Sequence, residues 1–415
     1  MKELPGRWLA STCACMLLAL APAHAAGPVE PALADDPAII ARLRALPPGH
    51  GVLLGEARMV GDFNDTARRF NLHQTGPRER DYSLKMAWAP QRGRALFAGA
   101  NHGQPHRLND VWEFDLGALA WILLYPPDLP RGGADLGEDA SDVVVRDGVL
   151  QTRRGGPAIV GHTWWGLTWD AGRERLLWMN VWVAKPEKLI EQLGGDPSTR
   201  YKGLPLWSFD PQRGQWELLR SGETAPRAMF GGLLEYIEPL GGSVWHANNW
   251  QSRGTWVLGN DDRNPWQDLA ANAGAGDFDE QSPGAELVGY FDPRRKVLVT
   301  QRGRATFHFD VASSTWARVR NEGEDSEAVP DGHDARTAFV HDPVSGEGLL
   351  VDLRNNGALW AYQPDSHLWR RVEVKGDALP EGRRRLVYFD VEHGVLVVIH
   401  DRRVWAYRHA RAQHP

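Results

Sequence analysis

The stretch that decides the fold runs from Ser83 to Leu124 and reads SLKMAWAPQRGRALFAGANHGQPHRLNDVWEFDLGALAWILL. It contains four short apolar runs, of which the first ends at Pro90 and the others cover 95–98, 111–114 and 121–124. Gly, Pro, Asn and Asp residues separate the runs, which is typical of antiparallel β-strands joined by turns. The stretch therefore predicts one unit of four strands.

The same unit recurs five more times, opening near residues 166, 233, 287, 338 and 386. The sixth copy stops after its third strand, at 404–407. Repeats of about 40 to 50 residues with four strands each are typical of β-propellers. The sequence therefore predicts an all-β, six-bladed propeller with four-stranded antiparallel blades. A seven-bladed ring is the alternative, if 143–145 and 149–150 pair as a hairpin inside the insert 126–160.

Four copies share a strand motif that is followed by a Trp. The matching residues are 109–115 with Trp121, 206–210 with Trp216, 307–310 with Trp316 and 359–362 with Trp369. In this motif the chain resembles the kelch family, including the central propeller of galactose-oxidase-like proteins, over most of residues 80–409. Gly99-Ala100 stands where that family has a Gly-Gly doublet. The resemblance implies a kelch-like propeller, a fold that hosts many activities.

The first 25 residues have the features of a signal peptide. Lys2 and Arg7 give a basic start, residues 8–20 are mostly apolar, and 23–25 read Ala-His-Ala, which fits the cleavage rule. Both cysteines, Cys13 and Cys15, lie in this segment. We therefore expect a mature chain without cysteine, exported to the periplasm or the outside. The apolar run is short for a membrane span, so no membrane contact is predicted.

The ends of the chain are expected to meet. Residues 26–50 are rich in Ala and Pro and predict an N-terminal tether, with a short helix at 36–46. Residues 52–54 resemble a strand that has no turn partner. Because the sixth copy lacks an outer strand, we expect this segment to complete it and close the ring, which protects the strand edges. The propeller then spans 51–409, and 410–415 form a C-terminal tail.

The net charge of −6 argues against a nucleic-acid partner, and we expect a monomer. In a propeller, the loops before each first strand and between the second and third strands open on one face, called here the predicted mouth. Residues that can donate hydrogen bonds or carry positive charge gather in these loops. Those expected to bind a substrate are Asn101, Arg227, Asn248, Asn249, Arg302, Arg336, Arg354 and His400. Because Arg binds carboxylates through paired hydrogen bonds, the predicted mouth indicates an anionic ligand.

An anionic ligand favours a polysaccharide lyase that cleaves a uronate-containing polymer by β-elimination. Such a reaction needs a neutralised carboxylate, a base for the neighbouring proton and an acid for the departing oxygen. We expect Tyr82, His102 and His162 to be catalytic, with His102 on the carboxylate and the other two transferring protons. The triplet Asn101-His102-Gly103 is similar to a loop of propeller-type ulvan lyases. This resemblance implies an acidic polysaccharide or oligosaccharide as partner.

The alternative function is a non-catalytic binding module for an anionic glycan or a protein partner. The same Arg, His and Trp side chains would bind it without any proton transfer. Neither function predicts a cofactor, and a structural divalent cation is left open. A copper-radical oxidase is excluded because it needs a Cys cross-linked to Tyr, and a sialidase is disfavoured because its Ser-x-Asp-x-Gly-x-Thr-Trp turn is missing.

Each candidate also has a structural interpretation. His102 can cap its loop, His162 can be a buried histidine, and Arg336 can bond to neighbouring loops. Asn248-Asn249 can be a turn pair. His246 falls in the middle of a second strand and is expected to pack there. Most of the 19 Trp residues occupy equivalent blade positions, which predicts packing between blades.

Overall fold

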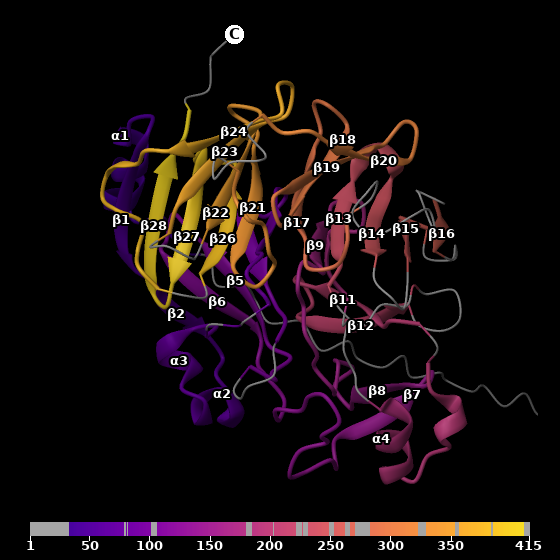
Figure 1. Cartoon of the computed structure of the whole chain (residues 1–415). Helices are drawn as coiled ribbons and strands as arrows, with labels where there is room; N and C mark the ends of the chain where they lie inside the picture. The colour runs from indigo at the N-terminus through magenta and orange to yellow at the C-terminus, as the bar shows by residue number, and fades with distance from the viewer. Residues whose placement is uncertain are drawn as a thin grey trace, which may run out of the picture.

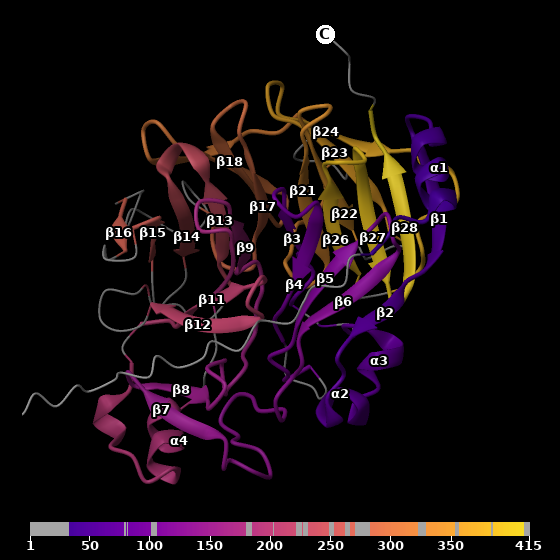
Figure 2. The same ribbon diagram turned by 180° about the vertical axis from the view of Figure 1, so that it is seen from behind.

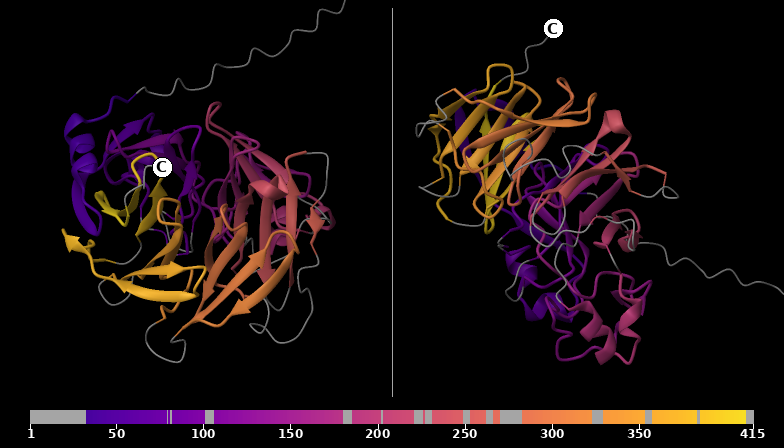
Figure 3. Two further views of the ribbon diagram at one scale, coloured as in Figure 1. Left: turned by 90° about the horizontal axis from the view of Figure 1, so that it is seen from above. Right: turned by 45° about the vertical axis from the view of Figure 1, so that its right-hand side comes forward.

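The computed structural model describes residues 33–78, 80, 82–100, 106–179, 185–201, 203–220, 226, 231–248, 253–261, 266–269, 283–322, 329–352, 357–382 and 385–410. Its main sheets are six blades arranged around a common centre, as Figure 3 shows from above. This confirms the predicted six-bladed, all-β propeller with four-stranded antiparallel blades.

Each blade runs from an inner strand at the channel to an outer strand at the surface. The first blade is β3 (Ala87–Ala89), β4 (Arg94–Phe97), β5 (Val111–Asp115) and β6 (Ala120–Tyr125); the second is β9 (Leu167–Asp170), β10 (Arg175–Met179), β11 (Leu206–Asp210) and β12 (Gln215–Arg220); the third is β13 (Leu233–Ile237), β14 (Gly242–Asn248), β15 (Arg253–Gly259) and β16 (Gln267–Asp268). The fourth is β17 (Val288–Asp292), β18 (Val297–Arg302), β19 (Ala305–Asp310) and β20 (Thr315–Val319); the fifth is β21 (Thr337–Asp342), β22 (Glu347–Asp352), β23 (Leu359–Gln363) and β24 (Leu368–Val372); the sixth is β26 (Leu386–Asp390), β27 (Val395–His400), β28 (Arg403–Arg408) and β1 (His50–Glu56). The inner strands contact one another in chain order and β26 contacts β3, which closes the ring.

The sixth blade is completed by the start of the chain, as the missing outer strand predicts. β1 pairs antiparallel with β28, and His50 lies opposite Arg408. On its other side, β1 pairs with the short parallel strand β25 (Lys375–Gly376). Figure 1 shows the indigo β1 beside the yellow β28. The first and last strands of the propeller therefore belong to one blade.

The predicted N-terminal helix is confirmed as α1 (Pro37–Ala45), which packs beside β1. The Asp36 side chain accepts a hydrogen bond from the Ala38 N–H at 2.8 Å, and Pro37 opens the first turn, so both favour a helix start here. Ile39 and Leu43 are buried in the hydrophobic cluster of the neighbouring blades. The helix is therefore part of the folded body.

The insert after the first blade is not a seventh blade. β7 (Val143–Arg146) and β8 (Val149–Thr152) pair as the expected hairpin, but they form a sheet of only two strands. Val143 and Leu150 pack against α4 (Pro186–Gln192), near η1 (Pro197–Thr199), while Val149 joins the core cluster of the adjacent blades. Figure 2 shows this lobe outside the ring. The seven-bladed alternative is therefore wrong.

Other elements decorate the first and third blades. β2 (Arg58–Gly61) adds a fifth, parallel strand outside β6, and is followed by α2 (Asp65–Arg69) and α3 (Leu72–Thr75). The turn between β13 and β14 contains η2 (Glu238–Leu240). Within the described residues, no helix is long and apolar enough to cross a membrane.

Buried tryptophans at the outer strands of the second, fourth and fifth blades tie these blades to the preceding ones. The Trp216 indole N–H donates to the Asn109 carbonyl at 3.1 Å. The equivalent groups of Trp316 and Trp369 donate to the hydroxyls of Thr255 and Thr306 at 2.8 and 3.1 Å. Each acceptor belongs to the blade before, so the predicted role of these tryptophans in packing between blades is confirmed.

Candidate functional site

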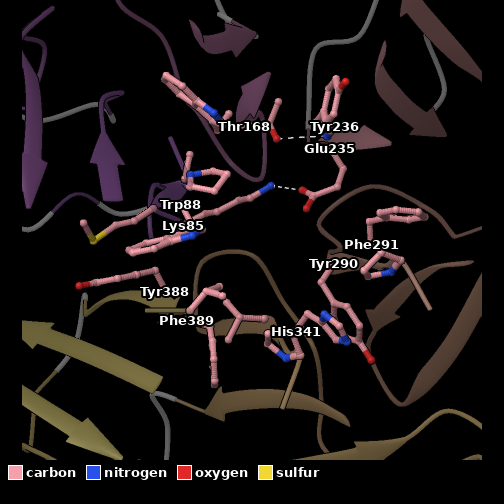
Figure 4. A pocket seen from close by; sticks show the side chains of 18 of the residues that line it. Lys85, Trp88, Thr168, Glu235, Tyr236, Tyr290, Phe291, His341, Tyr388 and Phe389 are labelled. Carbon is pink, nitrogen blue, oxygen red and sulfur yellow. Dashed lines mark hydrogen bonds and ion pairs between the residues drawn. The ribbon is translucent and has the colours of Figure 1, made fainter. Parts of the chain in front are cut away.

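Six equivalent side chains surround one end of the central channel. Each is the penultimate residue of an inner strand, so one strand residue separates it from the turn to the second strand. They are Trp88, Trp169, Tyr236, Phe291, His341 and Phe389. All six line a cavity of about 400 Å³, called here the aromatic cup (Figure 4). The propeller repeat therefore builds a ring of five aromatic residues and one imidazole from a single position in the repeat.

The rim of the cup is apolar. Pro90, Pro293 and Pro343 line it from the turns that follow β3, β17 and β21, and Val391 lies in the turn after β26 with 49% of its surface exposed. The cup therefore opens on the face that carries the turns between first and second strands. The predicted mouth lies at the other ends of the inner strands, on the opposite face.

An ion pair between blades forms the floor of the cup. Lys85, which precedes β3, pairs with the Glu235 carboxylate of β13, as the dashed line in Figure 4 shows. Its ammonium group also donates to the Leu234 carbonyl at 3.0 Å and lies 5.7 Å from the centre of the Trp165 ring. Burial lowers the pKa of Lys85, while the Glu235 charge opposes that shift. The bond joins the first blade to the third across the channel.

The channel is filled behind this floor. Trp165, before β9, is fully buried, and its indole N–H donates to the Gly289 carbonyl of the fourth blade at 2.7 Å. Leu84 and Leu287, at the starts of their inner strands, are also fully buried. The aromatic cup is therefore blind and does not continue to the predicted mouth as an open pore through the described residues.

The walls of the cup carry no charge at neutral pH. The His341 ring stacks on Tyr290, with 5.2 Å between ring centres and 12° between planes. Burial lowers the pKa of His341 to about 4, so the imidazole is neutral at pH 7. Trp88 stacks in the same manner on Tyr388, at 6.0 Å and 10°. The Thr168 hydroxyl accepts the Tyr236 N–H at 3.2 Å and adds a polar group near the floor.

Sequence reasoning missed the aromatic cup, although its signal is in the sequence. In each copy, the residue that forms the ring is the penultimate residue of the first strand. The predicted site lies at the opposite ends of these strands, because the longer loops are there. Aligning the residues near the turns shows a position that is aromatic in five of the six copies, but it does not show that this position lines a cavity.

At the predicted mouth, the structure brings Tyr82 and His162 together. Their rings lie 5.1 Å apart, and the His162 ring stacks on Trp164 at 4.4 Å. His162 is only 3% exposed, which limits contact with a polymer in this conformation. Tyr82 and Trp164 have φ of 57° and 47°, in the left-handed region that such residues rarely adopt. Strain of this kind is often found at functional sites.

Two predicted arginines lie where the fourth and fifth blades meet. The Arg302 side chain donates to the Ala285 carbonyl at 2.7 Å, and Arg336 is exposed. His333 lies in the loop before β21, with its Nε2 3.5 Å from a Glu286 carboxylate oxygen and its Nδ1 3.3 Å from one of Asp334. Asp334 is fully buried, and burial raises the pKa of its carboxyl to about 6.

The remaining predicted residues are dispersed. Asn248 is buried at the end of β14, opposite Arg253. His400 is buried at the end of β27 and accepts a hydrogen bond from Arg403 at 2.9 Å; burial lowers its pKa. Five predicted residues lie outside the described residues: Asn101, His102, Arg227, Asn249 and Arg354. Residue His246 is buried between Thr255 and the Pro283 carbonyl, as expected for packing.

Metal binding finds no support in the part of the chain that the structure describes. No three His, Cys, Asp or Glu side chains lie close enough there to hold an ion.

Comparisons with known proteins add the fold neighbours of the chain. No family model matches the sequence, and no curated protein matches it. Among solved structures, a gluconolactonase from Xanthomonas campestris has 12% identity and a TM-score of 0.43, covering 87% of this chain and 98% of that one. A protein of unknown function from Bacteroides thetaiotaomicron has 7% identity and a TM-score of 0.46, covering 85% and 75%. An auxiliary nutrient binding protein from Bacteroides ovatus has 8% identity and a TM-score of 0.47, covering 86% and 76%.

Similarity at this level carries no conclusion about activity. The kelch and ulvan-lyase resemblances of the sequence stay predictions.

Proposed function

We propose that the protein is a binding propeller that holds a carbohydrate in the aromatic cup. The observation that carries this proposal is the ring of six equivalent side chains around a blind cavity of about 400 Å³. This volume lies in the range of small-molecule sites, which are mostly apolar with a few placed polar groups. A repeat position filled by aromatic rings in every blade but one, where it is His341, gives the cup flat walls all round.

The polarity of the cup fits a sugar ring. A sugar has C–H groups on its faces and hydroxyls around its edge. The faces can lie against Trp88, Phe291 or another wall ring, because aromatic rings contact flat apolar surfaces well. The hydroxyls can reach Lys85, Glu235 and Thr168 at the floor. Because Lys85 and Glu235 are paired with each other, the cup offers hydrogen bonds and no free acid or base, which favours binding over catalysis.

Replacing one wall ring tests this proposal. Trp88→Ala should weaken binding of a sugar found on a glycan array by about tenfold in calorimetry, because it removes one stacking face. Phe291→Ala, on the fourth blade, should act in the same direction. The matched control is Trp360→Ala, because Trp360 is also half-buried but lies on β23, outside the cup. Equal loss in Trp88→Ala and the control, at unchanged melting temperature, would contradict the proposal.

A lyase acting on an acidic polysaccharide is the second candidate, and its support is at the predicted mouth. Tyr82 and His162, whose rings lie 5.1 Å apart, are residue types that can transfer protons, and Arg302 and Arg336 can attract a carboxylate on the same face. Ulvan, alginate, pectate, glucuronan, heparin and chondroitin should each be tested for the ultraviolet absorbance of an unsaturated uronate. A rise that His162→Ala abolishes and Trp88→Ala leaves unchanged would support the lyase. A flat trace with all six polymers would remove it.

A further inference from the structure

We infer that the aromatic cup selects an uncharged sugar and rejects its acidic and amino counterparts. This inference rests on the proposal that the cup binds a carbohydrate. It names the class of sugar, and it sets the cup apart from the predicted mouth, whose arginines favour an anion.

The charges inside the cup sum to zero. Among the described residues that line it, only Lys85 and Glu235 carry a full charge at neutral pH, and they are paired with each other. His341 also lines the cup and could become cationic by gaining a proton, but its pKa of about 4 keeps it neutral at pH 7. The other lining residues are aromatic, aliphatic, Pro, Gly or Thr. A charged ligand therefore finds no counter-ion that is free.

Taking a charge from the pair would leave the other partner alone. A uronate carboxylate could bind Lys85 only by displacing Glu235, and a sugar ammonium could bind Glu235 only by displacing Lys85. Either exchange leaves one buried charge without a partner, which costs far more than an exposed pair gains. A neutral hydroxyl can instead add a hydrogen bond to the pair while both charges stay matched.

The pair is also held in place. Besides Glu235, Lys85 donates to the Leu234 carbonyl and lies over the Trp165 ring, so three contacts fix its ammonium group at the closed side of the cup. Glu235 belongs to β13, whose backbone is paired with β14. Neither side chain can turn toward a ligand charge without losing these contacts.

A matched series of methyl glycosides tests the inference. For glucose, galactose and mannose, the neutral sugar, the uronic acid and the 2-amino-2-deoxy sugar are titrated by calorimetry at pH 7. Each series keeps the ring and replaces one substituent, the C6 hydroxymethyl group or the 2-hydroxyl, by a charged group. We expect the best neutral sugar to bind at least about tenfold more tightly than both of its charged forms, because a buried unpaired charge is costly. Equal or tighter binding of the uronic acid would overturn the inference and leave the carbohydrate proposal standing.

Two variants should shift the preference of the cup toward opposite ligand charges. Glu235→Gln leaves Lys85 without its partner, so the uronic acid should gain affinity and the neutral sugar should lose it. Lys85→Met leaves the opposite charge, so the amino sugar should gain. Glu392→Gln is the control, because Glu392 is exposed on the same face but does not line the cup. Melting temperatures show whether each variant is folded, and one folded variant is sufficient for the test.

The failures can be told apart. If no sugar in the series binds, and Trp88→Ala changes nothing, the carbohydrate proposal fails and the inference fails with it. If sugars bind and a folded Glu235→Gln variant keeps the selectivity of the original protein, only the inference is overturned.

Discussion

Among single residues, Asp334 carries a carboxylate whose burial is energetically unfavourable. It is fully buried, and neither carboxylate oxygen accepts a hydrogen bond from the described residues. His333 lies 3.3 Å from it, but the interactions with His333 and the Ala335 backbone do not offset the loss of water, and the pKa of Asp334 rises to about 6. The buried charge of Asp334 at the predicted mouth therefore costs stability at neutral pH.

Asp334→Asn should therefore stabilise the protein at pH 7.5 by about 2 kcal/mol, since it keeps the shape and removes the buried charge. The folded pKa is raised above its unfolded value near 3.8, so the charge costs stability in full above pH 6 and nothing below pH 4. The gain should disappear accordingly between pH 6 and pH 4. Urea unfolding at pH 7.5 and pH 4 measures it. A loss of stability at pH 7.5 would mean that the carboxylate is held as a charge by its surroundings.

Polar residues in loops could be recognised as candidate site residues from the sequence, whereas aromatic residues in strands could not. Arg and His at loop positions pointed to the predicted mouth, and the structure brings Tyr82 to His162 there. The sequence could not show that His162 is buried, because burial depends on Trp164 and on a neighbouring blade. Aromatic residues within strands resemble core residues in a sequence. Only the ring geometry shows that Trp88 and its equivalents line a cavity.

At the scale of elements, β1 is the strand on which ring closure depends. At Gly51 it packs tightly against the rest of the sixth blade, because a Cβ atom there would clash with the Trp405 ring and lie 2.8 Å from the Asp377 carbonyl oxygen. The Trp405 indole N–H donates to that same carbonyl at 2.9 Å. The contact leaves no space for a side chain and fixes the register of β1 against β28.

Gly51→Ala should lower the free energy of unfolding by about 1–3 kcal/mol, because an added methyl group forces Trp405 or the backbone to move. Gly259→Ala is the control. Gly259 ends β15, and a Cβ atom there meets nothing within 4 Å. Thermal unfolding of the two variants should show a clear drop for the first alone. Equal melting temperatures would mean that β1 can shift without cost.

Some elements could be predicted and others could not, for physical reasons. β1 was predicted because an incomplete blade needs a partner, and α1 because Asp36 and Pro37 mark a helix start. The hairpin of β7 and β8 was predicted, but its role was wrong, since α4 covers it from a distant part of the sequence. β2 was not predicted, because its parallel pairing with β6 has no local turn signal.

For the whole molecule, bonds across the channel connect blades that are not neighbours. The Lys85–Glu235 pair joins the first blade to the third, and Trp165 joins the second to the fourth through the Gly289 carbonyl. These contacts connect inner strands that are not adjacent around the ring. We expect them to hold the centre of the propeller rigid while the outer strands adjust.

Removing one partner of the pair should therefore cost much more than removing both. Lys85→Met should lower the free energy of unfolding by about 2–4 kcal/mol, because Glu235, whose side chain is 18% exposed, is left charged without its partner. Lys85→Met combined with Glu235→Leu should recover most of that loss. The double-mutant cycle is measured by urea unfolding at pH 7. Additive losses would show that the two side chains act independently.

The pairing of β1 with β28 also has a consequence for the order of the chain. His50 lies opposite Arg408, and the Gly49 N–H donates to the Arg408 carbonyl at 2.7 Å, so the two ends of the propeller are neighbours in space. The order of blades is in effect cyclic, and the place where translation begins is one choice among several. A circularly permuted gene that links these two ends and starts at a connection between two other blades would encode the same ring of blades.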